Sequence, residues 1–339
     1  MKAAVLKKSG GIEDLRSNLV IEDIAVPALS KDEVLIKVYS ASINHRDLWI
    51  SQGQYSKISL PVVLGSDCSG VVESVGTDVS EFKNGDEVIV NPGLNWGDNE
   101  EFQSSRFSIL GMPDNGTFAE FVKVKSTNVF RKPVHLTHEQ AASVPLAGVT
   151  AYRALFRKLN LTGKDNILIT GAGGGVSAFA LIFALNAGAK VFVTSGSESK
   201  IKKALTLGAA AGVNYNDPDW HEKIKSISGN SINAVFDSSG GDTYNKYMDI
   251  INPGGRIVSI GAGKGSVNGF SIHKLYWKQL KLYGSAMGSG KDFSDMLEFI
   301  NRRKIIPAVD TVFPLENIHE GFQLMNDAGQ FGKIIISIK

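Results

Sequence analysis

The stretch that most restricts the fold is residues 166–195, NILITGAGGGVSAFALIFALNAGAKVFVTS. An apolar run enters a glycine-rich turn, a helix-length apolar segment follows, and a second apolar run ends the stretch. This order predicts a strand, a tight turn, a helix and a second, parallel strand, which is the context of a phosphate-binding turn. Small residues there let backbone amides approach a pyrophosphate at the positive N-terminus of the helix. A tight turn without any ligand is the alternative interpretation.

The rest of the chain divides into two kinds of pattern. Apolar strands alternate with helix-length segments at 166–170, 190–194, 211–214, 233–237, 256–260 and 280–284, which predicts a parallel sheet. Residues 1–130 instead indicate short strands separated by turns, with a long polar excursion at 91–117. The spacing of Thr137 and Gln140 predicts a capping box at a helix start. An amphipathic helix at 292–304 and a final strand, GKIIISI, complete the chain.

Composition excludes several classes of protein. The net charge is +2, from 36 basic and 34 acidic residues without a concentrated basic stripe, so we expect no nucleic-acid partner. The single cysteine, Cys68, excludes an intrachain disulfide and any multi-cysteine metal site. The opening MKAAVLKKSG lacks the apolar stretch of a signal peptide, and the apolar window at 176–189 is too short to span a membrane. We therefore expect a cytoplasmic protein that acts on a small molecule and has no membrane partner.

The glycine turn predicts a dinucleotide site. Gly171, Gly174 and Ser177 occupy the three key spacings, so a serine replaces the third glycine. The candidate phosphate-binding residues are Gly171, Gly173, Gly174, Gly175 and Val176.

The end of the second strand, TSGSESK, predicts which nicotinamide dinucleotide binds. An acidic residue there would accept hydrogen bonds from the ribose of NAD and repel a 2′-phosphate, but Ser195 stands at that place. Ser195 and Ser197 supply hydroxyl groups, and Lys200 supplies a point charge for a phosphate. Tyr215, at the end of the next strand, can reach the same spot. Lys200 and Tyr215 taken singly would be ordinary surface residues, whereas together with the missing carboxylate they favour NADP.

Several stretches, in order along nearly the whole chain, carry a family resemblance: SINHRDLWISQGQY, LPVVLGSDCSGVVESVG, NGDEVIV, AGVTAYRAL, ITGAGGGVS and FGKIIISI. The chain resembles the medium-chain dehydrogenase/reductase superfamily, specifically its zinc-free quinone oxidoreductase-like branch. The resemblance implies an α/β fold in which a GroES-like β-rich catalytic domain, 1–147 plus 287–339, holds an inserted Rossmann NADP-binding domain, 148–286. It also implies a substrate cleft between them and a homodimer or homotetramer that pairs through the strand around KLYGSAMG.

The chain departs from the family pattern at the positions that bind zinc in other members. In zinc-dependent members, a Cys, a His and a further Cys hold a catalytic zinc, and the resemblance places them at Asn44, Ser66 and near Leu146. The first three cysteines of the structural zinc fall on Trp96, Asn99 and Phe102. None of these residue types is a normal zinc ligand, so we expect no metal. His135 and His138 form an HxxH pair without thiol or carboxylate company, which favours an ordinary loop.

The resemblance also supplies catalytic candidates. Zinc-free relatives carry an Asn and a Tyr at Asn44 and Tyr55, and we expect these two to donate hydrogen bonds to an oxygen that becomes negative as hydride arrives. Asp47 is expected to anchor the loop. Two roles stay open for Arg46, orientation of an acidic substrate group or exposure to solvent, and His45 suits the site and the surface equally.

The remaining candidates follow strands or the start of the inserted domain. Thr150, Gly261 and Ala262 are expected near the nicotinamide, and Ser238 and Gly240 near the nucleoside. Cys68 has no evident base beside it and is expected to be a small buried residue.

Together these features predict an NADPH-dependent oxidoreductase that reduces quinones or α,β-unsaturated carbonyls by hydride transfer without a metal. Two alternatives stay open. One is a metal-free aldehyde or ketone reductase of the alcohol dehydrogenase type, and the other is a non-catalytic protein that binds or senses NADPH.

Overall fold

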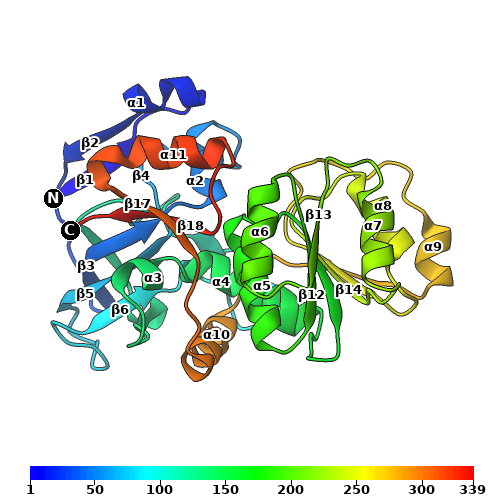
Figure 1. Ribbon diagram of the computed structural model, residues 1–339. Helices are drawn as coiled ribbons and strands as arrows, with labels where there is room; N and C mark the ends of the chain where they lie inside the picture. The colour runs from blue at the N-terminus through cyan, green and yellow to red at the C-terminus, as the bar shows by residue number, and fades with distance from the viewer. The chain divides into compact units, whose positions relative to one another are not determined.

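The structure, a computed structural model, describes residues 1–339. The chain divides into two compact units, the first formed by Met1–Ala147 with Gly288–Lys339 and the second by Gly148–Met287. Both termini therefore belong to the first unit, where the blue and red ends of the chain meet in Figure 1.

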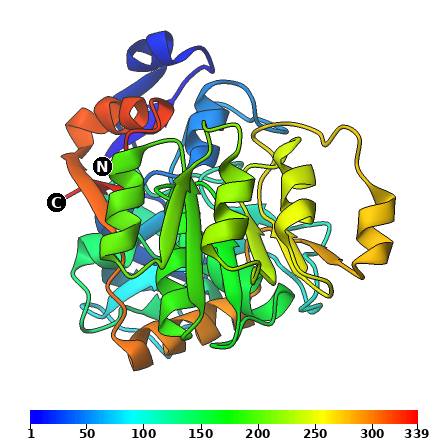
Figure 2. The ribbon, with the colours of Figure 1, turned by 45° about the vertical axis from the view of Figure 1, so that its right-hand side comes forward.

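The second unit is built on a six-stranded parallel sheet with the order β13-β12-β11-β14-β15-β16. Every predicted strand is present, and the order is that of a doubly wound dinucleotide-binding fold. Helices α5 and α6 lie on one side of these strands and α7 and α8 on the other (Figure 1), and Figure 2 turns this green-to-yellow unit toward the viewer. The strands are β11 Asn166–Ile169, β12 Lys190–Ser195, β13 Ala211–Asn214, β14 Ala234–Asp237, β15 Arg256–Ser259 and β16 Lys281–Gly284. The helices are α5 Gly175–Asn186, α6 Glu198–Thr206, α7 Trp220–Ile227, α8 Thr243–Ile250 and α9 Ile272–Trp277, with a π-helix at Arg153–Lys158.

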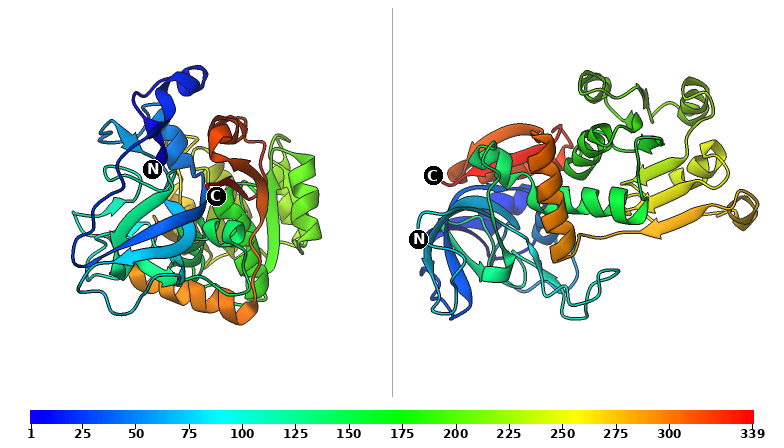
Figure 3. Two further views of the ribbon diagram at one scale, coloured as in Figure 1. Left: turned by 90° about the vertical axis from the view of Figure 1, so that its left-hand side faces the viewer. Right: turned by 90° about the horizontal axis from the view of Figure 1, so that it is seen from below.

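The first unit is rich in β-structure. A seven-stranded sheet has the order β10-β6-β5-β3-β18-β17, with β9 paired to β3, and a separate three-stranded sheet has the order β2-β1-β4. The blue and cyan strands curl around their shared core in the left view of Figure 3. The strands are β1 Lys2–Leu6, β2 Leu19–Asp23, β3 Glu33–Ser42, β4 Val62–Val63, β5 Asp67–Val75, β6 Glu87–Val90, β7 Gly93–Leu94, β8 Ser108–Ile109, β9 Phe121–Lys125, β10 Val129–Arg131, β17 Val309–Pro314 and β18 Lys333–Ser337. The remaining helices of the chain are α1 Leu15–Asn18, α2 His45–Ser51, α3 His138–Ala142, α4 Pro145–Tyr152, α10 Gly290–Arg303 and α11 Ile318–Asn326.

Local signals account for several element ends. The predicted capping box is confirmed, because Gln140 N donates to Thr137 Oγ1 at 3.3 Å and Thr137 N donates to Gln140 Oε1 at 3.0 Å at the start of α3. The predicted amphipathic helix is α10, which begins slightly earlier, after its own capping residue Ser289.

Strands β18 and β5 both pair with β3, and these pairings bring side chains from distant parts of the chain together in the first unit. The last strand, β18, runs antiparallel to β3, with Ile335 opposite Ser42. Strand β5 pairs with the other edge of β3, so Asp67 also lies opposite Ser42. The start of β18 is thereby brought to the end of β3, next to Asn44 and Asp67.

Candidate active site

The glycine turn of the second unit has the backbone of a phosphate-binding loop. Gly171 and Gly173 have φ values of +65° and +116°, a region that favours glycine. Ser177, at the third glycine position, donates its hydroxyl to Thr170 O at 2.8 Å, so the serine closes the turn onto the preceding strand. No side chain caps α5, whose N-cap is Gly174, and the first N–H groups of this helix therefore suit an anionic group.

The residues predicted to select NADP gather beside this turn. The Ser195 hydroxyl donates to Ala172 O at 3.0 Å, and Ser197 N donates to Ser195 Oγ at 3.4 Å. The stem of Lys200 lies against the turn, because a Cβ on Gly173 would come within 2.6 Å of Lys200 Cδ.

The aromatic ring of Tyr215 and the ammonium group of Lys264 also belong to this cluster. A Cβ on Gly196 would come within 2.7 Å of the Tyr215 hydroxyl, which places that ring over the end of β12. Lys264, which the sequence did not single out, has its Nζ 4.6 Å from the Tyr215 ring centroid. Glu198, the acidic residue of the same segment, accepts from Asn214 Nδ2 at 2.9 Å. Basic and hydroxyl groups therefore gather at the end of β12, beside the turn.

The candidates after β14 and β15 also lie together. The Ser238 hydroxyl donates to Thr170 O at 3.0 Å, and a Cβ on Gly261 would come within 2.8 Å of Ser238 O. A Cβ on Gly240 would come within 3.0 Å of Ala262 Cα. Close backbone approach thus explains the small residues at these two strand ends. Thr150 is buried, with Oγ1 4.0 Å from Met287 Sδ.

A buried aspartate that the sequence did not indicate holds these strand ends. Asp237, at the end of β14, is fully buried and accepts hydrogen bonds from Tyr247 Oη at 3.0 Å and Ser259 Oγ at 3.1 Å. Gly240 N also donates to its carboxylate, at 3.2 Å. Asp237 thereby fixes the loop in which Ser238 lies.

In the first unit, Asn44 belongs to a buried polar network. Asn44 is 6% exposed, and its Nδ2 donates to Asp67 Oδ2 at 2.9 Å. Its Oδ1 accepts from Lys333 Nζ at 2.5 Å. Asp67 is further bound by Ser42 Oγ at 2.9 Å and by Leu146 N at 2.9 Å. Burial lowers the pKa of Lys333, while Asp67 opposes that shift.

Arg46 connects this network to the other catalytic candidate, Tyr55. Arg46 is only 6% exposed, which excludes the solvent-facing role. Its Nη1 donates to Ser66 Oγ at 2.8 Å and to Leu110 O at 3.0 Å, and its guanidinium carbon lies 5.3 Å from the half-buried ring of Tyr55. Asn44 and Tyr55 therefore border the same cluster through Asp47, which accepts from Asn44 N and lies 3.8 Å from Arg46 Nη1.

Asp47 anchors the loop, as its motif indicates. Its Oδ2 accepts from Asn44 N at 2.8 Å and its Oδ1 from Gly65 N at 3.3 Å. Burial raises the pKa of this carboxyl to about 6, although the nearby Arg46 guanidinium lowers it.

The cluster does not suit the catalytic zinc of the family. Asn44 Oδ1 already accepts from an ammonium group, and Ser66 Oγ from a guanidinium group, so two cations hold the side chains at the expected ligand positions. At the third position Leu146 offers a backbone N–H, which donates to Asp67. No three His, Cys, Asp or Glu side chains of the chain lie together as a metal site would require.

The long excursion at 91–117 is closed by aromatic packing. Trp96 is 6% exposed, its Nε1 donates to Asn99 O at 2.9 Å, and its ring meets Phe107 edge to face at 5.3 Å. Phe102 is exposed. The residues at the expected structural-zinc positions therefore do not fit a metal either.

The other histidines and the cysteine contribute little to this cluster. His45 is exposed, with its ring 5.9 Å from Trp49. His138 Nδ1 lies 2.8 Å from the buried Ser69 hydroxyl, and His135 Nε2 lies 3.2 Å from Ile305 O, so the two members of the HxxH pair have separate partners. Cys68 is fully buried and burial raises the pKa of its thiol, which makes it a poor nucleophile.

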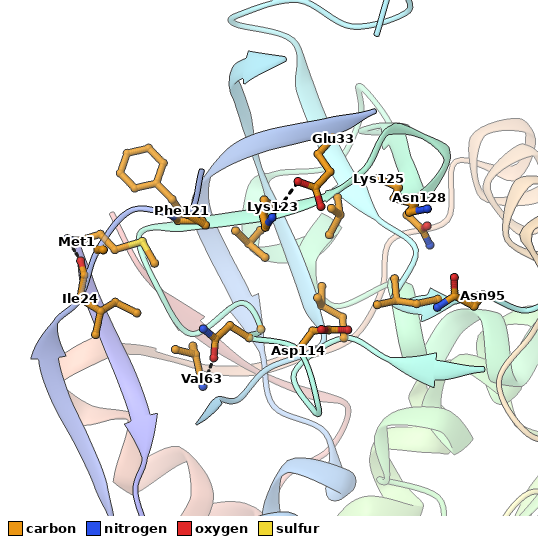
Figure 4. Close-up of a pocket in the computed structure, with 18 residues that line it drawn as sticks. Met1, Ile24, Glu33, Val63, Asn95, Asp114, Phe121, Lys123, Lys125 and Asn128 are labelled. Atoms are coloured by element: carbon orange, nitrogen blue, oxygen red, sulfur yellow. Dashed lines mark hydrogen bonds and ion pairs between the residues drawn. The ribbon is translucent and has the colours of Figure 1, made fainter. Parts of the chain in front are cut away.

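The first unit also contains a cavity of about 430 Å³, lined in part by Leu110. Figure 4 shows its walls, with Glu33 paired to Lys123. The backbone N–H of Val63 donates to Asn115 Oδ1 at 2.9 Å. None of the predicted site residues lines it, and two of its charged residues, Glu33 and Lys123, pair with each other at 2.9 Å.

Comparison with known proteins agrees with this architecture. The protein-family model of the alcohol dehydrogenase GroES-like domain matches residues 30–134. The family model of zinc-binding dehydrogenases matches residues 175–302. A zinc-type alcohol dehydrogenase-like protein of Schizosaccharomyces pombe is 35% identical over 94% of each chain. An acryloyl-coenzyme A reductase of Sulfurisphaera tokodaii is 31% identical over 93% of this chain and 95% of its own. The crystal structure of an NAD-dependent alcohol dehydrogenase superposes with a TM-score of 0.92, at 36% identity and full coverage of both chains.

These relatives are oxidoreductases and match nearly the whole chain. The second unit also supplies the turn that a nicotinamide dinucleotide needs. No helix has the length and apolar character required to cross a membrane. The chain therefore belongs to the medium-chain dehydrogenase/reductase superfamily and is an oxidoreductase with a GroES-like domain and a Rossmann-type domain for a nicotinamide cofactor.

Proposed function

We propose that this protein is an NADPH-dependent reductase of quinones or α,β-unsaturated carbonyls that works without a metal. The observation that carries the proposal is the buried network at the expected zinc positions. There, Lys333 and Arg46 hold Asn44 and Ser66, and hydrogen-bond donors stand where a Lewis acid would be. The similarity to an acryloyl-coenzyme A reductase supports an acceptor with a conjugated double bond.

The chemistry of such an acceptor suits hydrogen-bond donors. A bound reduced nicotinamide supplies a hydride, which adds to a carbon conjugated with a carbonyl group. The electron pair displaced from the double bond then spreads onto the carbonyl oxygen as enolate or phenolate. Asn44 and Tyr55 are the proposed donors to this oxygen, each contributing on the order of a hundredfold in rate when well aimed. Water then supplies the proton that completes the reduction.

The preference for NADPH rests on the groups beside the glycine turn. Ser195 and Ser197 bring hydroxyls to the end of β12, and Lys200 lies on Gly173. A phosphate dianion gains charge-assisted hydrogen bonds from such groups, whereas the unphosphorylated ribose of NAD finds no carboxylate to hold its hydroxyls.

A substrate panel tests the proposal. We expect oxidation of NADPH with a quinone or a short enone, much slower oxidation of NADH, and no loss of either rate on incubation with a metal chelator. Turnover of simple aldehydes or ketones but not of enones would identify a carbonyl reductase instead. Tight NADPH binding without turnover of any acceptor would identify a binding protein.

We also propose that the chain forms a homodimer through the open edge of its parallel sheet. Strand β16 pairs on one side only, with β15. The neighbouring helix α9 exposes Ile272, Tyr276 and Trp277 by 61%, 59% and 73%. Light scattering should give the mass of a dimer, or of a tetramer of two such pairs, and Trp277→Glu should shift it toward the monomer. A monomeric wild-type protein would contradict this assembly.

A further inference from the structure

Lys333 has an environment that leaves its ammonium group no free donor. The residue is 3% exposed and lies at the start of β18. Its Nζ donates to Asn44 Oδ1 at 2.5 Å, to Ile43 O at 3.0 Å and to Asp67 Oδ2 at 3.3 Å. An ammonium group has three N–H bonds and accepts none, so these three acceptors use all of them. Lys333 can therefore influence a substrate only through the groups that it holds.

The Asn44 amide lies between two neighbours of opposite hydrogen-bonding character. Lys333 can only donate, so the amide atom that faces it must be the oxygen. Asp67, which pairs with Lys333 at 3.3 Å, accepts hydrogen bonds through its carboxylate oxygens, so the amide atom that faces it must be the nitrogen. The two ends of the amide group are thus fixed. One N–H of Nδ2 is used by Asp67, and an amide nitrogen carries a second.

We propose that Lys333 is a positioning residue that fixes the orientation of the Asn44 amide, so that the second N–H of Nδ2 is the donor for the acceptor oxygen. This inference rests on the proposed function, in which Asn44 binds that oxygen. Without Lys333 the amide loses the cation bonded to its oxygen, and only Asp67 and the backbone N–H of Asp47 remain to hold its orientation.

The positive charge of Lys333 also makes the Asn44 amide a stronger hydrogen-bond donor. An amide whose oxygen is bonded to a cation becomes polarised, and its N–H groups become stronger donors. The cation thus acts on the substrate oxygen only through the amide group. Asp67 balances the charge of Lys333, which is why a fully buried ammonium group is tolerated there.

A double-mutant cycle tests the inference. Asn44→Ala, Lys333→Met and the double variant are compared by kcat with NADPH and an enone. We expect Asn44→Ala to lower kcat by about a hundredfold and Lys333→Met by about tenfold or more. The double variant should be no slower than Asn44→Ala, because Lys333 acts through Asn44. The KM for NADPH should change little in all three.

Lys132→Met is the matched control. Lys132 is likewise a buried lysine of the first unit, 8% exposed, whose Nζ donates to Leu136 O at 2.7 Å and pairs with Glu87 at 3.2 Å. Its loss removes a buried ammonium group but touches none of the Asn44 network. We expect a lower unfolding temperature with kcat kept.

A second variant covers the case in which Lys333→Met fails to fold. Lys333→Arg keeps a donor-only cation against Asp67 but changes the position of the donor, so the same cycle can be run with it. A readout independent of turnover is the side-chain NH₂ signal of Asn44 in protein labelled with ¹⁵N-asparagine. Changing Lys333 should move this signal, whereas Lys132→Met should leave it in place.

The outcomes separate the two proposals. Multiplicative losses in the cycle, or an Asn44 signal that ignores Lys333, would overturn the positioning role while the proposed reductase activity stands. An Asn44→Ala variant with the wild-type kcat would remove Asn44 as donor and overturn both that assignment and this inference. A wild-type protein without turnover would refute the reductase, and the NH₂ signal alone would then decide whether Lys333 orients the amide.

Discussion

Asp47→Asn should remove a large part of the pH dependence of stability. The Asp47 carboxyl is fully buried at the start of α2, and burial raises its pKa from 3.8 to about 6 in spite of the neighbouring guanidinium. The unfolded chain exposes this group to water and returns its pKa to the ordinary value. Between the two pKa values the folded state therefore holds a proton that the unfolded state has released.

The size of the effect follows from the shift. A shift from 3.8 to about 6 corresponds to about 3 kcal/mol, at about 1.4 kcal/mol per pKa unit. Because the folded pKa is raised, this stabilisation is fully present below the unfolded pKa and is lost as the pH rises through the folded pKa. As the pH rises through the unfolded and then the folded pKa, the wild-type free energy of unfolding should thus fall by about 3 kcal/mol because of Asp47 alone. Asn does not titrate, so the variant should lack this fall.

Denaturant unfolding from about pH 4 to about pH 8 measures the difference between wild type and variant. Glu33→Gln is the control of opposite sign. Burial works to raise the pKa of Glu33, but the Ser30 amide and Lys123 outweigh it and lower that pKa. This control should therefore lose stability at neutral pH, and the loss should disappear in acid. Parallel curves for wild type and Asp47→Asn would refute the assignment of a proton to the buried carboxyl.

Three further substitutions test the sites. Lys200→Ala should raise the KM for NADPH by about tenfold or more and leave the KM for NADH nearly unchanged, because only the phosphate loses a charged partner; equal effects would argue against the phosphate assignment. Ser195→Asp should shift preference toward NADH, since a carboxylate accepts from ribose hydroxyls and repels a phosphate; an unchanged NADPH-to-NADH ratio would mean that another surface recognises the ribose. Tyr55→Phe should lower kcat about tenfold or more with cofactor affinity kept, measured by NADPH titration and turnover; wild-type turnover would remove Tyr55 from the candidates.

The fold was predictable where the sequence pattern is local. All six strands of the second unit could be located from runs of apolar residues between helix-length segments. The inner strands β11, β12 and β14 are almost wholly buried, whereas the edge strands β13 and β16 are only partly buried. Ser177 was recognisable as a departure from the glycine motif, but its compensating hydrogen bond to Thr170 O is visible only in the structure. Lys264 was missed because a loop lysine after a strand end carries no signal of the tyrosine that it approaches.

The proposed catalytic network was less predictable because its members come from opposite ends of the chain. Asn44 and Asp67 lie in motifs that the family resemblance makes visible, but Lys333 is 289 residues beyond Asn44 and begins a short apolar strand. Its contact with Asn44 depends on the register of β18 against β3, which neither strand specifies by itself. The burial of Arg46 also depends on a segment that is distant in sequence, because its guanidinium group donates to carbonyl groups of the loop around Leu110.

The charge balance of the cluster around Asn44 and Arg46 indicates which kind of acceptor the proposed reductase should reduce. Two cations, Arg46 and Lys333, face two carboxylates, Asp47 and Asp67, within 3.8 Å and 3.3 Å. Such a cluster adds no net positive charge, unlike a divalent metal, so an alkoxide with its charge confined to one oxygen would receive little stabilisation from it. N–H and O–H donors suffice better where the charge is spread over a conjugated system, as in an enolate or a phenolate. A simple ketone should accordingly be a much poorer acceptor than the matching enone, and equal kcat/KM values for such a pair would contradict this electrostatic argument.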